Sequence, residues 1–124
     1  MTAEGIIAVV TGAVTSPASL LLARYDDTGR LRLIARTTPS PAAVRRDLGG
    51  RLHVADPDHP WQGRRFSAGW GTRGDLDYAP VLPELVAEFI SDTAIDEGRY
   101  RHPVRFLRLR EDLEAEQVPA YGSG

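Results

Sequence analysis

The sequence contains no lysine, because all 15 of its basic residues are arginine. Schiff-base chemistry, phosphate binding by a P-loop lysine and formation of a lysyl-adenylate each require a lysine amine. Arginine stays protonated and cannot replace that amine as a nucleophile. The composition therefore excludes these three kinds of chemistry for the chain.

Cysteine is also absent, which excludes disulfides, thiolate nucleophiles and cysteine-ligated zinc. No apolar run approaches the roughly 20 residues of a membrane-spanning helix. The opening residues MTAEGIIAVVTGAV lack the basic leader and the cleavage pattern of a signal peptide, and they predict a first strand instead. We therefore expect a cytoplasmic protein without a membrane partner.

The length and composition favour one globular domain rich in β-structure. A chain of 124 residues suits a single core, and its 12 glycines and 9 prolines indicate many turns. We expect the domain to cover residues 1–118 and a flexible tail to cover residues 119–124.

Apolar patterns and turn signals predict about five strands. Residues 4–14 form the first, with a bend near Gly12, and residues 19–25 and 30–36 form a hairpin around the turn Asp-Asp-Thr-Gly. In its second arm, Arg30, Arg32, Ile34 and Arg36 share one face and Leu31, Leu33 and Ala35 share the other, which is the pattern of a strand with one buried face. Two further strands are predicted by VLPELVAEFI and by RHPVRFLRLR, the second with Val104, Phe106, Leu107 and Leu109 as its apolar residues.

One short helix is predicted near the middle of the chain. Ser40 is its expected N-cap, Pro41 its first residue and Gly49-Gly50 its end. Its apolar stripe consists of Ala42, Ala43, Val44 and Leu48. Five strands with one inserted helix predict an all-β Greek-key barrel of the oligonucleotide-binding (OB) type.

Five arginines and no acidic residue lie between residues 99 and 110, although the net charge of the chain is −2. They are Arg99, Arg101, Arg105, Arg108 and Arg110. Such a run suits phosphate contacts with nucleic acid. It also suits a charged strand edge that discourages pairing with other chains. Because side chains alternate along a strand, Arg105 need not share a face with Arg108 or Arg110.

Residues 53–80 are rich in proline, glycine, aspartate and tryptophan, which predicts a long loop with one short strand around residues 65–70. The loop contains aromatic residues among arginines, a mixture that suits base stacking or phosphate contact: Trp61, Phe66, Trp70 and Tyr78 with Arg64, Arg65 and Arg73. The favoured interpretation is that the aromatic residues cover the open end of the barrel. Arg64 and Arg65 are then the candidate nucleic-acid contacts of the loop.

Other polar residues are predicted to be structural. One group has side chains of the metal-binding type: His53, Asp56, Asp58 and His59. Their spacing is not that of a helical metal-binding pair, and Pro57 and Pro60 favour a polar turn, so we expect no metal. No nucleophile motif accompanies His102. Glu84 and Glu88 are expected on the solvent side of a strand rather than as a catalytic pair.

Several segments in order resemble the C-terminal OB domain of the ATP-dependent DNA ligases. The ligase strand LVAEV and the motif VI ending RHPxFxxLRxDK are similar to VLPELVAEFISDTAIDEGRYRHPVRFLRLRED. The opening strand and hairpin of that domain, particularly in actinobacteria, resemble TAEGIIAVVTGAV and SLLLARYDDTGRLRLIARTT. Its middle loop resembles HPWQGRRFSAGWGTRG. The resemblance covers roughly residues 3–118.

The residues that match motif VI are Arg101, His102, Pro103, Phe106, Arg108, Arg110 and Asp112. Leu113 replaces the terminal lysine of the motif. The K-x-D-G motif of the adenylated lysine, the metal-holding glutamates and the motif V lysines of the ligases are absent. The run EGII near the start has the form of motif IV, but the VTGAV that follows fits the start of the barrel better.

In the ligases this domain closes over ATP during self-adenylation and holds the DNA minor groove during sealing. The resemblance implies a non-catalytic module without a cofactor that binds nicked or double-stranded DNA and acts in trans with a separate adenylation protein. The candidate DNA contacts are Arg64, Arg65, Arg101, Arg105, Arg108 and Arg110. The alternatives are a protein-interaction module without DNA binding and an unrelated small-ligand barrel, whose apolar pocket Trp61 or Trp70 would line.

Overall fold

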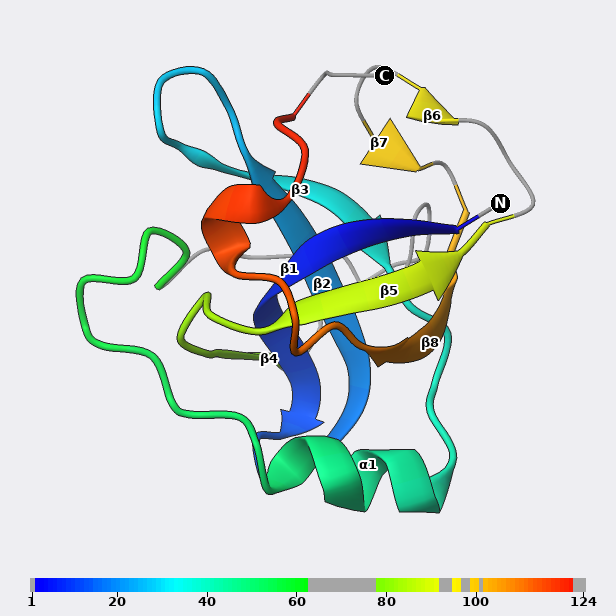
Figure 1. The fold of residues 1–124 in the computed structure, drawn as a ribbon. Helices are drawn as coiled ribbons and strands as arrows, with labels where there is room; N and C mark the ends of the chain where they lie inside the picture. Colours follow the sequence, from blue (N-terminus) through cyan, green and yellow to red (C-terminus); the bar gives the residue numbers. More distant parts are fainter. Residues whose placement is uncertain (1, 63–77, 92–94, 97–98, 101, 122–124) are drawn as a thin grey trace.

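The computed structural model describes residues 2–62, 78–91, 95–96, 99–100 and 102–121. Its strands are β1 (Thr2–Ala13), β2 (Ser16–Tyr25), β3 (Leu31–Arg36), β4 (Tyr78–Pro80), β5 (Val86–Ile90), β6 (Ile95–Asp96), β7 (Arg99–Tyr100) and β8 (Arg105–Leu109). The helix α1 (Ala42–Gly49) follows β3, and a 3-10 turn, η1 (Ala115–Gln117), follows β8. Figure 1 shows α1 across one end of the curved sheet. None of the helices in these ranges has the length and apolar character needed to cross a membrane.

The sheet closes into a barrel. Its strands follow the order β3-β2-β1-β5-β8 with antiparallel neighbours, and β4 also pairs with β1. A parallel bridge between Thr37 and Val104 joins the two outer strands. There the Val104 N–H donates to the Arg36 carbonyl at 2.8 Å, and the Thr38 N–H donates to the Val104 carbonyl at 2.8 Å. The predicted all-β barrel of OB type, with one inserted helix, is therefore confirmed.

One carboxylate organises the turn between β2 and β3. The Asp26 Oδ1 atom accepts hydrogen bonds from the Thr28 hydroxyl at 2.6 Å, the Thr28 N–H at 2.9 Å and the Arg30 N–H at 3.0 Å. These bonds, that of the Thr28 hydroxyl above all, lower the pKa of Asp26 to about 2. Gly29 follows with φ of +83°, a conformation that glycine adopts without strain. The predicted hairpin is confirmed.

Strand β3 contains a β-bulge. Leu33 and Ala35 pair with consecutive residues of β2, which leaves Ile34 between them as the extra residue. Leu31 and Leu33 pack on the opposite side of the sheet, whereas Ile34 and Ala35 are both fully buried in the barrel interior. The prediction that Ala35 shares a face with Leu31 and Leu33 was wrong, because the bulge interrupts the alternation after Ile34.

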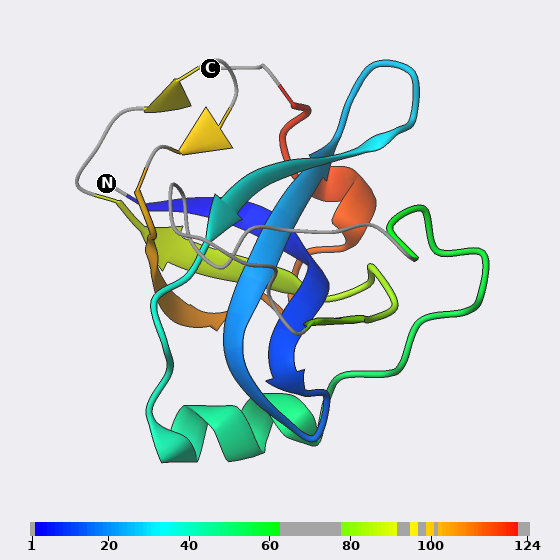
Figure 2. The same cartoon turned by 180° about the vertical axis from the view of Figure 1, so that it is seen from behind.

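Hydrophobic layers lie on both sides of the sheet. The barrel interior is filled by large side chains such as Phe89, Ile34 and Leu20. An outer layer, on the other side, consists of Ile6, Ala8, Val9, Leu21, Ala23, Leu31, Trp61, Val86, Ala115 and Val118. Both views place η1 against this side of β2 (Figures 1 and 2). Leu21 and Ala23 are 0% exposed, so the outer side of β2 is covered.

Helix α1 begins one residue later than predicted. Its N-cap is Pro41, whose backbone is extended with ψ of 158°, and no side chain caps the helix. Ser40 is therefore not the N-cap. The Ser40 N–H instead donates to the Ala18 carbonyl at 2.9 Å, which continues the extended path that follows β3.

Only part of the predicted apolar stripe of α1 faces the core. Leu48 is buried and Val44 half-buried, whereas Ala42 and Ala43 are exposed, because residues four apart share a helix face and adjacent residues do not. The last helical residue, Gly49, lies so close to the turn between β1 and β2 that a Cβ atom would collide with the Thr15 carbonyl. This contact fixes the end of α1 against the sheet.

The boundaries of the later strands differ from the prediction. Strand β4 lies in the stretch predicted as a loop, and Val54 forms an isolated bridge with Val81. Strand β5 begins only at Val86, because the preceding residues form a turn in which the Glu84 N–H donates to the Leu82 carbonyl at 2.8 Å. The short strand predicted around residues 65–70 lies outside the described residues.

Candidate nucleic-acid interface

The outer face of β8 and the residue after it present three of the predicted DNA contacts, Arg105, Arg108 and Arg110. Phe106 and Arg108 lie opposite consecutive residues of β5, so Leu107 is the extra residue of a β-bulge and is 39% exposed. Because Phe106 packs inward against the core, its neighbour Arg105 faces outward. Regular alternation would put Arg105 and Arg108, three residues apart, on opposite faces, and the bulge brings them to the same one.

Acidic side chains of two other strands face these arginines. Glu4 of β1 lies opposite Glu88 of β5, which in turn lies opposite Arg108. The Arg108 Nε atom donates to Glu88 Oε1 at 2.9 Å. The Arg110 Nη1 atom lies 3.5 Å from Glu88 Oε2 and 3.7 Å from Glu4 Oε2. This cation offsets the repulsion expected between two like charges on directly opposite residues.

Arg110 is also bound by Asp112, two residues further along the chain. Its Nε and Nη2 atoms donate to the two carboxylate oxygens of Asp112 at 2.9 and 2.8 Å, a bidentate pair. The hydrogen bond lowers the pKa of Asp112 to about 2 and raises the pKa of Arg110. Glu4, Glu88, Arg108, Arg110 and Asp112 form what we call the carboxylate–arginine cluster. With three carboxylates and two guanidinium groups, it has one net negative charge.

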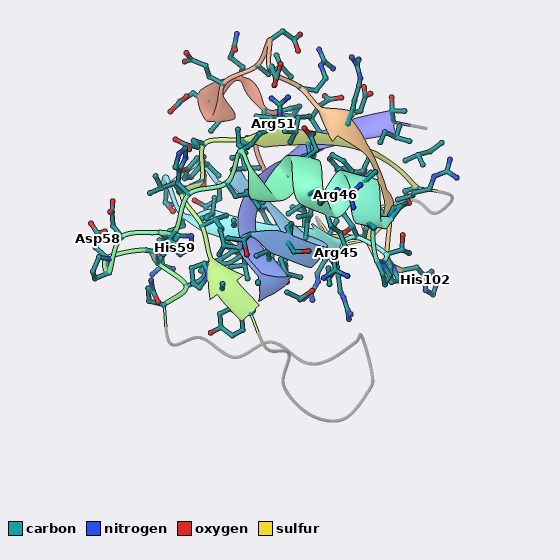
Figure 3. All side chains as sticks on the ribbon, turned by 90° about the horizontal axis from the view of Figure 1, so that it is seen from below. Arg45, Arg46, Arg51, Asp58, His59 and His102 are labelled. Atoms are coloured by element: carbon teal, nitrogen blue, oxygen red, sulfur yellow. The ribbon has the colours of Figure 1, made fainter. Side chains whose placement is uncertain are left out.

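Further arginines, which the sequence reasoning did not single out, lie on and after α1. Arg45 donates to a backbone carbonyl of β2 at 3.0 Å, Arg46 is exposed, and Arg51 forms an ion pair with Glu111. Figure 3 shows Arg45 and Arg46 projecting from α1, with His102 on the side where the helix begins. The consecutive arginines in a predicted helix were the sequence signal for this second basic surface, which lies outside the arginine face of β8.

Several predicted site residues lie outside the part of the chain that the structure describes. They are Arg64, Arg65 and Arg101, together with Phe66, Trp70 and Arg73. Of the residues that match motif VI, His102 and Pro103 are exposed and directly precede Val104, which closes the barrel. Arg99, on β7, is exposed.

Trp61 belongs to the outer layer of the sheet. It is 2% exposed, and its backbone N–H donates to Nδ1 of His59 at 3.0 Å. Burial lowers the pKa of His59. Tyr78 packs against the same layer. Both aromatic residues thus cover the outside of the sheet rather than an open end of the barrel. OB folds usually bind oligonucleotides across their second and third strands. Here the outer layer covers the outer side of β2, whereas Arg105 and Arg108 of β8 are exposed, so β8 is the more open face.

The pocket beside Trp61 lies outside the barrel. It has a volume of ≈ 730 Å³ and is lined by Tyr25, Gly29, Arg30, Leu31, Arg32, Pro60, Trp61 and Pro83. Arg32 lies 3.3 Å from an Asp26 carboxylate oxygen and 4.6 Å from the centre of the Tyr121 ring. The arginines Arg30 and Arg32 in the lining of this pocket distinguish it from the apolar pocket expected of a small-ligand barrel.

The remaining polar candidates do not form one site. The Nδ1 atom of His53 lies 2.7 Å from Glu84 Oε1, whereas His59 is buried beside Trp61. In the described ranges, no three histidine, cysteine, aspartate or glutamate side chains are grouped so that they could hold a metal ion. Glu84 lies in the turn before β5 and Glu88 on the strand, so the prediction that they share a strand face was wrong.

Comparison with known protein families finds no family profile that matches the chain. DNA ligase C2 of Mycolicibacterium smegmatis is 36% identical, over 78% of this chain and 32% of the relative. DNA ligase C of Mycobacterium tuberculosis is 32% identical, over 77% of this chain and 30% of the relative. DNA ligase C1 of Mycolicibacterium smegmatis is 31% identical, over 77% of this chain and 28% of the relative. The chain therefore spans only about a third of the length of these curated relatives, and it is homologous to that part of the mycobacterial DNA ligase C proteins, as its resemblance to ATP-dependent DNA ligases predicted.

Proposed function

We propose that the chain is a ligase-type OB domain that binds nicked or double-stranded DNA and has no catalytic activity of its own. The observation that carries this proposal is the bulge at Leu107, which aligns Arg105, Arg108 and Arg110 on one outward face. Guanidinium groups on one face can contact neighbouring phosphates, and phosphate contacts supply most non-specific affinity for DNA. The homology to DNA ligases supports the same function.

The carboxylates of the cluster are compatible with DNA binding. The side chain of Asp112 is 64% exposed, and exposed ion pairs contribute little to stability. A phosphate offers the Arg110 guanidinium the same bidentate geometry as a carboxylate. A DNA phosphate can therefore replace Asp112 at Arg110 when the duplex binds.

The covalent steps of ligation would occur on another domain or protein. This sequence has no lysine on which an adenylate could form. We propose that a separate adenylation domain closes against the face that presents Arg108, Arg110 and Asp112. In that arrangement the chain supplies charge and position, and the adenylation domain supplies the nucleophile.

The test is binding of a fluorescent nicked duplex at two salt concentrations, with the intact chain and with an Arg105→Ala/Arg108→Ala/Arg110→Ala variant. We expect the intact chain to bind more weakly as salt rises, with a slope of about −0.9 for each phosphate contacted. The triple variant should lose most of the affinity and about two to three units of that slope. Absence of binding by the intact chain at low salt would contradict the proposal.

A protein-interaction role without DNA binding is the second candidate. The net charge of −2 and the mixed charges of the carboxylate–arginine cluster favour it, because dedicated DNA-binding domains usually have an excess of positive charge. Calorimetric titration with a purified ligase adenylation domain distinguishes the two. Binding to that domain, weakened by Asp112→Asn and accompanied by no affinity for DNA, would establish the second role.

A further inference from the structure

A small groove lies between the segment that leads into α1 and the start of β8. Its volume is ≈ 300 Å³, and it is lined by Thr38, Pro39, Ser40, Pro41, Val44, Arg105 and Phe106. A backbone hydrogen bond of 2.8 Å, from the Thr38 N–H to the Val104 carbonyl, joins its two walls. The groove therefore belongs to the closed barrel and not to a separate loop.

The lining of this groove suits an anion. Its charged lining residue is Arg105, which is exposed and forms no ion pair within the part of the chain that the structure describes. The hydroxyl groups of Thr38 and Ser40 add hydrogen-bond donors, and none of the lining residues is a carboxylate. Phe106 supplies an apolar surface beside Arg105.

The groove continues the arginine face of β8. Arg105 pairs with Ile90, and Arg108 pairs with Glu88 two positions away on β5. Two positions on a strand correspond to roughly 7 Å. Measured along the axis of a B-DNA duplex, this is about two nucleotides of one strand, at roughly 3.4 Å of rise each. A single DNA strand can therefore contact the groove and Arg108 at the same time.

We propose that the groove binds one phosphodiester group of a DNA strand, with Arg105 as its anion-binding residue and Thr38 and Ser40 as additional donors. This inference rests on the proposed DNA-binding function and extends it from β8 to the segment before α1. It also assigns Arg105 a direct phosphate contact, whereas Arg108 and Arg110 must first exchange carboxylates for phosphates.

The experiment compares Arg105→Ala with Arg46→Ala in binding to a fluorescent nicked duplex. Arg46 is an exposed arginine of α1 outside the groove lining, so both variants lose the same charge. We expect Arg105→Ala to weaken binding about tenfold at low salt and to reduce the salt slope by about 0.9. Arg46→Ala should change the affinity less than twofold. Thermal unfolding of both variants checks that they remain folded.

Amide NMR spectra locate the contact. Addition of the duplex should shift the amide signals of Thr38, Ser40 and Phe106 in the intact chain, and much less in Arg105→Ala. If the intact chain binds DNA but Arg105→Ala behaves like Arg46→Ala, or if the shifts avoid the groove, the groove site is wrong while the DNA-binding function stands. If the intact chain does not bind DNA at low salt, both fail.

Discussion

The two halves of the arginine face of β8 present the same cation in opposite surroundings. In the C-terminal half, Arg108 and Arg110 contact the carboxylates of Glu88 and Asp112, and Glu4 lies nearby. In the N-terminal half, Arg105 lines a groove with hydroxyl and apolar side chains and no carboxylate. The arginines of the C-terminal half are therefore paired with carboxylates of the chain itself, whereas Arg105 in the N-terminal half can attract an external anion directly.

The difference shows that an arginine run does not reveal which of its members can bind an external anion. No acidic residue lies between residues 99 and 110. The carboxylates that face Arg108 and Arg110 come from β1, from β5 and from the residues after β8. Strand register, together with Asp112 just beyond the arginine run, thus decides the charge that a phosphate would meet.

Among the changes considered, removal of the carboxylates that pair with Arg108 and Arg110 should have the largest effect on DNA affinity. In the variant Glu88→Gln/Asp112→Asn both arginines of the C-terminal half become available to phosphates. We expect its affinity for a nicked duplex to rise roughly tenfold at low salt, with a salt slope steeper by about 0.9 for each additional phosphate that the variant binds. Fluorescence anisotropy at several salt concentrations measures both quantities.

The matched control is Glu114→Gln/Glu116→Gln, which removes the same number of negative charges. Both of these residues are exposed and lie after β8, outside the carboxylate–arginine cluster. An equal rise in affinity in the two double variants would show that only the net charge affects DNA binding. It would contradict the inference that the carboxylates act by pairing with Arg108 and Arg110.

A smaller effect is expected on stability. Arg108→Ala removes the cross-strand bond to Glu88 and should lower the free energy of unfolding by about 0.2–1 kcal/mol. Arg105→Ala removes an exposed side chain without an ion pair in the described part of the chain, and should change it by less than about 0.5 kcal/mol. Urea unfolding of both variants measures the difference. A greater loss for Arg105→Ala would mean that Arg105 has a structural role.

The smallest effect concerns pH. The pKa of Asp112 is lowered from the ordinary value of 3.8 to about 2, so its pairing with Arg110 stabilises the fold above pH 4. That contribution is lost as the pH falls from about 4 to about 2, because the unfolded state, in which the pKa has its ordinary value, then binds more protons than the folded state. Thermal unfolding should therefore show Asp112→Asn to be less stable than the intact chain at pH 6 and equal to it near pH 2. A difference that persists at pH 2 would point to another cause.

The features that could be predicted from the sequence are those set by local patterns. The turn around Asp26 and Gly29 follows from its turn chemistry, and the alternation on either side of it gives the hairpin. Gly49-Gly50 marks the end of α1. The barrel then follows from the number of strands and the position of the helix, because few arrangements bury that many apolar faces.

The features that could not be predicted depend on packing between distant segments. The bulges at Ile34 and Leu107 each add one residue to a strand, and no local pattern distinguishes that residue from its neighbours. The bulge at Leu107 decides the candidate site, because it brings Arg105 and Arg108 to one face. The approach of Glu4 to Arg110 likewise requires the register of three strands. Trp61 was expected to cover the open end of the barrel, but it packs in the outer layer of the sheet.

The closure of the barrel also affects how fast a ligand could bind. Backbone hydrogen bonds that link Thr38 and Arg36 to Val104 hold the two walls of the groove together. Gly49 packs closely against the turn between β1 and β2, which positions α1. A preorganised cleft of this kind needs little rearrangement on binding, so less conformational entropy is lost. Association with DNA should then be limited by diffusion and electrostatic steering, with a rate that depends strongly on ionic strength and hardly on the dynamics of the fold.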